Sequence, residues 1–182
     1  MTKSERITAY REFMPKPKQI LYNRLDTIGF FDAPASTKYH GAYEGGLFDH
    51  SLEVAKTLVD LTDKLGLKWE RTISPYIVGM FHDLCKCDNY VEIKSFEEVA
   101  PIGIKYKYNP GVIIPGHGDK SVIMLSRYIE LTDEEIACIR WHMGAYETDT
   151  KMWDYYGRAI EKYPNVLYAH TADMIASKIK GV

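Results

Sequence analysis

The strongest constraint in this sequence is an apolar run that ends in a histidine followed directly by an aspartate, within GMFHDLCKCDN. Successive side chains of a helix point about 100° apart, so His82 and Asp83 can both reach one ion at the helix's inner edge. A buried carboxylate is unfavourable unless a cation or hydrogen-bond donors accompany it. The pair therefore indicates a metal site at a buried helix end.

Further histidines and aspartates occur in segments with a helical pattern. They are His50, His117, His142 and Asp173. His50 lies on the apolar stripe of an expected helix at 47–65, so we expect it to point inward. A lone histidine on such a face is more often a core residue, but the other candidate ligands favour metal binding. Asp173 lies among alanines, so it is either exposed to solvent or bound inside to a positive group.

This set of imidazoles and carboxylates suits iron, manganese, nickel, cobalt or zinc. Six protein ligands exceed what one catalytic ion needs if it also keeps positions for water. We therefore expect two ions about 3.5–4 Å apart, bridged by one carboxylate. Asp83 is the expected bridge because it is central in the order of ligands. Such a pair supports attack of activated water on phosphorus.

Three other side chains are candidates for chemistry or substrate contacts. Lys86 follows the histidine–aspartate pair by about one turn and can place an ammonium against a phosphate, so we expect it and Asp83 to act in catalysis. His40 lies in an irregular loop, where substrate contact, proton donation to the leaving oxygen and a plain hydrogen-bonded role all stay open. Lys120 is a further candidate for substrate binding.

Periodicity and capping signals predict an all-α fold. The expected helices span residues 4–14, 17–28, 47–65, 70–86, 118–130, 132–143 and 164 onward, with a short helix around 154–162. Thr132 and Glu135 form the expected capping box of one of them.

One part of the chain breaks the helical pattern. Alternation at 90–93 and 102–108 predicts a small β-hairpin around 90–108, within an insertion at 90–116 that is placed to shape substrate access. We expect a single domain over residues 1–182, with scaffold helices at 1–32.

Composition limits the remaining classes of function. The 182 residues are 46% hydrophobic and 26% charged, which is typical of a globular protein. A net charge of −2 gives no sequence-wide basic track for nucleic acid. We find no membrane span and no secretory signal, and therefore expect a cytoplasmic protein. Three cysteines without framework spacing fit a reducing compartment, and we interpret Cys85 and Cys87 as small residues near a helix end.

His50, the HDLCK motif at 82–86 and the late Asp173 together resemble the HD-domain superfamily of metal-dependent phosphohydrolases. The likeness runs from about Pro34 to Ser177. PASTKYHGAYEGGLFDHSLEVA resembles the segment before the first metal histidine in HD-domain exoribonucleases and related small HD proteins. GHGDKS and RWHMG resemble the extra histidine segments of subgroups with two metals, a pattern shared with HD-GYP phosphodiesterases.

The resemblance implies an all-helical HD-domain bundle and phosphoester hydrolysis. By motif position it implies one ion held by His50, His82, Asp83 and Asp173, and a second held by His117, His142 and the bridging Asp83. Lys86 matches the lysine of the family's HDxGK motif, whereas Cys85 stands where glycine is usual, a departure that bears on the local backbone. The missing GYP segment argues against a cyclic dinucleotide substrate.

We expect the protein to cleave a phosphomonoester or phosphodiester bond of a nucleotide or another small phosphoester. Two alternatives stay open. A single-strand nuclease of the HD exoribonuclease type would use the Lys and Tyr residues of IKYKY with Lys94 and Lys120, although no accessory nucleic-acid-binding domain is expected. A non-catalytic sensor would bind a metal or nucleotide without turnover.

Overall fold

The computed structural model of the protein describes residues 1–15, 19–94, 105–144 and 150–182. Its helices are α1 (Lys3–Phe13), α2 (Gln19–Thr27), α3 (Gly46–Leu65), α4 (Ser74–Phe81), α5 (Lys86–Asn89), α7 (Gly118–Leu125), α8 (Asp133–Arg140), α9 (Thr150–Lys162) and α10 (Asn165–Met174), followed by the π-helix η2 (Ile175–Lys180). The strands β1 (Tyr90–Glu92) and β2 (Tyr106–Tyr108) form a small antiparallel hairpin. The predicted all-α fold with a hairpin insertion is confirmed.

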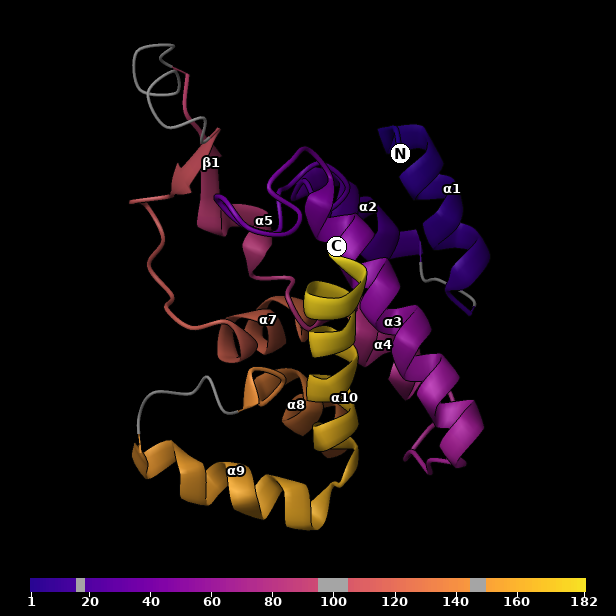
Figure 1. The fold of residues 1–182 in the computed structure, drawn as a ribbon. Helices are drawn as coiled ribbons and strands as arrows, with labels where there is room; N and C mark the ends of the chain where they lie inside the picture. The colour runs from indigo at the N-terminus through magenta and orange to yellow at the C-terminus, as the bar shows by residue number, and fades with distance from the viewer. Residues whose placement is uncertain (16–18, 95–104, 145–149) are drawn as a thin grey trace.

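The helices of the bundle pack around α3 and α10. Helix α3 contacts α4 and α10, and α8 contacts α7 and α10. Figure 1 shows α9 at one end of the molecule and the hairpin near the opposite end. None of the helices in the described ranges combines the length and hydropathy needed to cross a lipid bilayer.

The core includes a cluster of aromatic rings between α3, α4 and the loop after α2. Phe30 contacts Phe31, Phe48 and Phe81 at ring-centroid distances of 5.5, 5.9 and 6.0 Å. All four side chains are fully buried. Burial of this face of α3 is favourable by the hydrophobic effect and turns its neighbour His50 inward.

Helices α3 and α4 approach each other closely at Gly79. A Cβ atom placed on Gly79 would lie 2.4 Å from the Cα atom of Ala55, which is closer than real Cβ contacts. Glycine at this position therefore lets the two backbones meet and brings the end of α4 close to His50.

A buried carboxylate fixes the position of α8. The predicted capping box between Thr132 and Glu135 is present. The Arg71 guanidinium donates to both carboxylate oxygens of Glu135, at 2.8 and 2.5 Å, and the Ser74 hydroxyl donates at 2.8 Å. Because such bidentate pairs are geometrically specific, they tie the start of α8 to the start of α4.

Several helices end earlier than the periodicity predicted. The expected helix 70–86 stops at Phe81, and the expected helices 118–130 and 132–143 stop at Leu125 and Arg140. Beyond these ends the chain continues in tighter turns, in which an amide bonds the carbonyl three residues back, as Leu84 does to Phe81 at 3.1 Å. The apolar pattern continues through such turns, which is why it overestimated the helix lengths.

The other differences concern α9 and the hairpin. Helix α9 begins at Thr150, four residues before the short helix expected around 154–162. In the hairpin Tyr90 pairs with Tyr108 and Glu92 with Tyr106. Residues 102–104 of the predicted second strand lie outside the described residues.

Candidate metal centre

The six candidate ligands come from separate elements and meet at one place in the interior. His50 lies on α3 and Asp173 on α10, and His82 and Asp83 directly follow α4. His117 immediately precedes α7, and His142 follows α8 by two residues. Within the described residues, potential ligand atoms gather in three overlapping groups, His50–His82–Asp173, His82–Asp83–His142 and Asp83–Cys85–His117, each with its atoms within 4.8 Å of one another.

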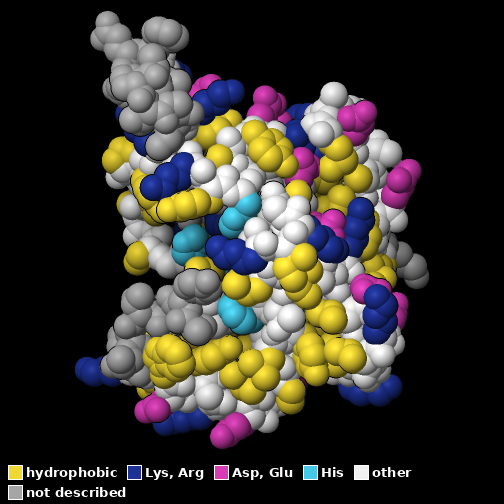
Figure 2. Space-filling model, in the orientation of Figure 1, with side chains coloured by type: hydrophobic (Ala, Val, Ile, Leu, Met, Phe, Trp, Pro, Cys, Tyr) yellow, Lys and Arg dark blue, Asp and Glu magenta, His cyan; other side chains and the backbone are white. Residues whose placement is uncertain are grey.

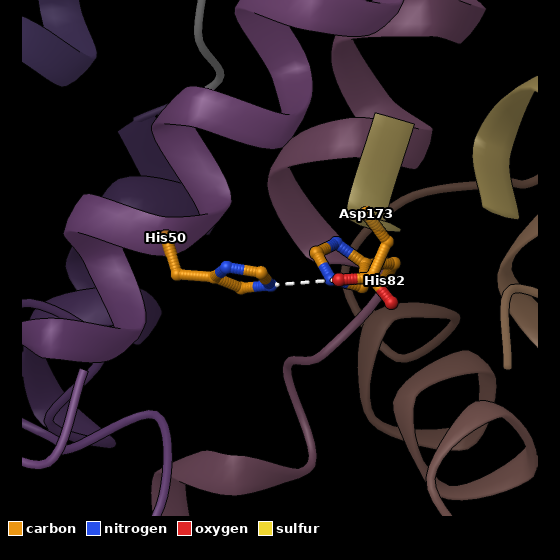
Figure 3. A group of neighbouring side chains, drawn as sticks. All are labelled: His50, His82 and Asp173. Carbon is orange, nitrogen blue, oxygen red and sulfur yellow. Dashed lines mark ion pairs between the residues drawn. The ribbon is translucent and has the colours of Figure 1, made fainter. Parts of the chain in front are cut away.

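Figure 3 shows the first of these groups, in which the side chains of His50, His82 and Asp173 point toward one another. The Nε2 atom of His50 lies 3.1 Å from Oδ1 of Asp173. Asp173 therefore faces the interior of the protein. The sequence had left open whether this side chain is exposed to solvent or bound inside.

Asp83 lies at the centre of the whole cluster. Its Oδ2 atom lies 3.4 Å from Nε2 of His82 and 3.8 Å from Nε2 of His50. Its Oδ1 atom lies 3.4 Å from Nε2 of His142 and 3.6 Å from Nδ1 of His117. Each carboxylate oxygen thus faces a different pair of imidazoles, the arrangement that a carboxylate bridging two cations requires.

The early helix ends orient two of the imidazoles. The Nδ1 atom of His82 lies 2.9 Å from the carbonyl oxygen of Gly79, and Nδ1 of His142 lies 2.8 Å from that of Ile139. Both carbonyls belong to the last turn of their helices, where carbonyl oxygens lack an intrahelical partner. If Nδ1 donates its proton to them, Nε2 keeps a lone pair for a metal.

The C-terminal segment orients the third imidazole in the same way. The Nδ1 atom of His50 lies 2.9 Å from the backbone carbonyl oxygen of Val182. No sequence pattern predicts this contact, because it depends on η2 and Gly181 carrying the chain back to α3.

Several buried polar atoms of the cluster have no hydrogen-bond partner among the described residues. They are Nε2 of His50, His82 and His142, and Oδ1 of Asp83. Buried polar atoms are nearly always paired in folded proteins. A divalent cation is a partner that suits imidazole nitrogens and a carboxylate oxygen alike, so the residues fit a metal centre.

The electrostatics keep the carboxylates ionised. Burial raises the pKa of Asp83, but the positive charges of Lys86 and His82 outweigh burial and hold this pKa well below its ordinary value. Burial likewise raises the pKa of Asp173, yet its interaction with the nearby His50 ring and the charge of His82 bring it below the ordinary value. Both carboxylates are therefore ready to bind a cation at neutral pH.

His117 is the most accessible of the candidate ligands. Its side chain is 36% exposed, whereas those of His50, His82 and His142 are almost fully buried. Interactions of its ring with the Asp83 carboxylate and the Cys85 sulfur raise the pKa of His117 to about 10. The His117 side of the cluster thus faces the surface.

The candidates for substrate contact lie at different distances from the cluster. The Lys86 ammonium is buried and lies 2.6 Å from Oδ2 of Asp83. The His40 ring lies 5.3 Å from the ring of His50, and burial lowers its pKa. Lys120 is instead buried against Asp88 and the Asn89 side-chain oxygen, outside the three groups of potential ligands.

Histidine side chains are visible on the face of the molecule that Figure 2 shows. They lie there beside Lys or Arg side chains.

Cys85, which replaces the glycine usual in the motif, has φ −55° and ψ −26°. This right-handed backbone conformation is open to any residue, so the motif keeps its local geometry without glycine.

Comparisons with known proteins agree with this geometry. The family model described as "HD domain" matches residues 47–177. The chain is 36% identical over 87 residues to the dihydroneopterin 2',3'-cyclic phosphate phosphodiesterase of Methanocaldococcus jannaschii. The matched segment covers 44% of this chain and 34% of that protein. The chain thus spans about a third of the length of this curated relative. No solved structure matches the chain.

The matched residues include all six candidate ligands and run from the first turn of α3 into η2. They cover most of the sequence. The protein belongs to the HD-domain family.

Proposed function

We propose that the protein is a metal-dependent phosphohydrolase that cleaves a phosphoester bond of a small, nucleotide-like substrate. The observation that carries the proposal is the position of Asp83, whose two buried oxygens face imidazoles on opposite sides. The HD-domain match supports the reaction class, and the name of the relative supports a phosphodiester as substrate.

We assign His50, His82 and Asp173 to one cation and His117 and His142 to the second, with Asp83 shared between them. When bound, the two cations supply activated water and neutralise charge on the phosphoryl oxygens. The carbonyl contacts at Nδ1 favour the tautomer in which Nε2 of His50, His82 and His142 is available to a cation. The fixed carbonyl contacts thereby preorganise the site before any ligand binds.

We assign charge compensation and substrate contact to the side chains around the cluster. Lys86 compensates the charge of Asp83 at 2.6 Å and places a positive charge beside the site. His40 lies next to His50, and its lowered pKa leaves it neutral at pH 7, so its ring can donate one hydrogen bond and accept another. We infer that His40 contacts the substrate by a hydrogen bond, because proton donation to the leaving oxygen would need the imidazolium form that its lowered pKa disfavours.

A cyclic phosphodiester of a nucleoside or pterin-like alcohol is the first substrate to test, given the printed activity of the relative. The purified protein should be incubated with manganese, iron, cobalt, nickel or zinc. The panel should contain phosphomonoesters, linear phosphodiesters and 2',3'- and 3',5'-cyclic nucleotides. We expect turnover with at least one metal and one ester, and none in Asp83→Ala.

The same panel separates the alternatives. Hydrolysis of single-stranded oligonucleotides with strong salt dependence would favour a nuclease over a small-molecule esterase. Stoichiometric binding of a nucleotide without turnover under any metal would favour a sensor. Absence of both turnover and metal binding would contradict the proposed function.

A further inference from the structure

We propose that the thiol of Cys85 is an additional ligand of the metal centre, on the side of His117, and binds there as a thiolate. This inference rests on the proposed metal-dependent function and adds a ligand to its second position. On binding, the sulfur–hydrogen bond is broken heterolytically, the proton passes to solvent and the sulfur lone pair binds the cation. No oxidant or reductant is needed.

The position of the sulfur carries the inference. Cys85 is fully buried, and its Sγ atom lies 3.9 Å from Nδ1 of His117. Ligand atoms of Cys85, His117 and Asp83 lie within 4.8 Å of one another. Asp83 belongs to the same group, and its Oδ1 atom is buried without a hydrogen-bond partner among the described residues. This oxygen therefore needs a positive partner close to the thiol.

The backbone holds this cysteine in place. Its amide N–H donates to the hydroxyl oxygen of Ser121 on α7 at 3.1 Å. His117 immediately precedes the same helix. The thiol and the imidazole are therefore positioned relative to each other by one helix and one short turn, as two ligands of a common ion need to be.

The sulfur accepts a hydrogen bond from a polar side chain that is itself held in place. The Asn89 side-chain amide donates to Sγ at 3.7 Å, and its oxygen accepts a hydrogen bond of 2.8 Å from the buried Lys120 ammonium. Lys120 thereby fixes which end of the Asn89 amide faces the sulfur. Hydrogen bonds of this kind orient a ligand and stabilise its charge, and they give the buried Lys120 a role.

A thiolate changes which metals the site prefers. Soft sulfur ligands favour zinc or iron, whereas carboxylate and water ligands suit magnesium and manganese. With glycine in the same position, the second ion would be held by imidazole and carboxylate alone. We therefore expect Cys85 to shift the second position toward zinc, iron or cobalt.

Cobalt loading tests the inference without reference to activity. A thiolate bound to Co²⁺ gives a charge-transfer band in the near ultraviolet. We expect this band in the wild-type protein and in the Cys87→Ser/Cys138→Ala variant, where Cys85 is the remaining one of three cysteines. We expect it to be lost in Cys85→Ser and in Cys85→Ala, with circular dichroism showing that each variant is folded.

The outcomes separate this inference from the proposed function. Bound cobalt, shown by elemental analysis, without the band in the wild-type protein would overturn the role of Cys85 alone. The same holds if the band persists in Cys85→Ser. No cobalt bound at all would contradict the metal centre and the role of Cys85 together.

Two further readouts test the chemistry of the ligand. We expect the affinity of the second position for zinc to fall at least about tenfold in Cys85→Ala, because loss of even a side chain that only hydrogen-bonds a ligand has that effect. Asn89→Ala should keep the cobalt band but shift its wavelength, because the hydrogen bond to sulfur is lost. An unchanged band position in Asn89→Ala would contradict the supporting role of Asn89.

Discussion

Asp83 and the imidazoles around it define the site at the scale of single residues. Each carboxylate oxygen of Asp83 lies 3.4–3.8 Å from two imidazole nitrogens. The contacts of Nδ1 with backbone carbonyls leave Nε2 of three histidines directed into the cluster. The individual ligands should therefore divide between two ions.

Substitution of one histidine on each side tests this division. We expect His50→Ala to lose the ion on the Asp173 side and His142→Ala to lose the other, each retaining about half of the bound metal of the wild-type protein. Elemental analysis of the purified variants measures this. Loss of all metal in both variants, or of none, would contradict the assignment to two positions.

Individual ligands of the site could be predicted where a residue able to bind metal lies on the apolar face of a predicted helix. His50 can be identified because it lies on an apolar stripe, and its complete burial confirms that it points inward. Whether Asp173 is exposed or faces the interior could not be decided from its sequence neighbours. The contact from His50 to Val182 could not be predicted, because a backbone carbonyl has no sequence signal and the two residues are 132 positions apart.

At the scale of elements, the metal centre depends on where helices stop. Because α4 and α8 end at Phe81 and Arg140, the carbonyls of Gly79 and Ile139 are free to orient His82 and His142. Periodicity predicted that these helices exist but not where they end. The apolar pattern does not distinguish an α-helical turn from the tighter turn that follows it.

The close approach of α3 and α4 gives a prediction with a matched control. Gly79→Ala places a methyl group 2.4 Å from the Cα atom of Ala55, so we expect destabilisation by about 1–3 kcal/mol despite alanine's better helix propensity. Gly157→Ala on α9 meets nothing within 4 Å and should stabilise by roughly 0.5–1 kcal/mol.

Chemical denaturation of both variants measures the two changes in the free energy of unfolding. Opposite signs are expected, because the two glycines lie in helices but only one faces another backbone. Equal effects would show that helix propensity, and not the α3–α4 contact, determines the result at Gly79.

At the scale of the whole molecule, bound metal and folding are coupled, since the ligands come from helices that are far apart in sequence. Removal of metal by a chelator should lower the free energy of unfolding. At metal concentrations of 100 times Kd, one site contributes about 2.7 kcal/mol, or about 5–10 °C in Tm for a protein of this size. An unchanged Tm after complete metal removal would contradict this coupling.

The metal-free protein should also show a characteristic pH dependence. The pKa of His117 is raised from 6.5 to about 10 in the folded protein, so the protonated form stabilises the fold. This contribution is complete below pH 6.5 and is lost as the pH rises through about 10. Tm of the metal-free protein should therefore fall over this range, and fall less in His117→Gln. An identical slope in the variant would assign the effect to other groups.

The metal content of Asp83→Ala tests the central claim most directly, with Asp60→Ala as control because Asp60 is exposed and forms an ion pair with the exposed Lys64. The account predicts two divalent ions per chain in the wild-type protein and in Asp60→Ala, and none in Asp83→Ala. Retention of both ions by folded Asp83→Ala would contradict the claim that this carboxylate joins them.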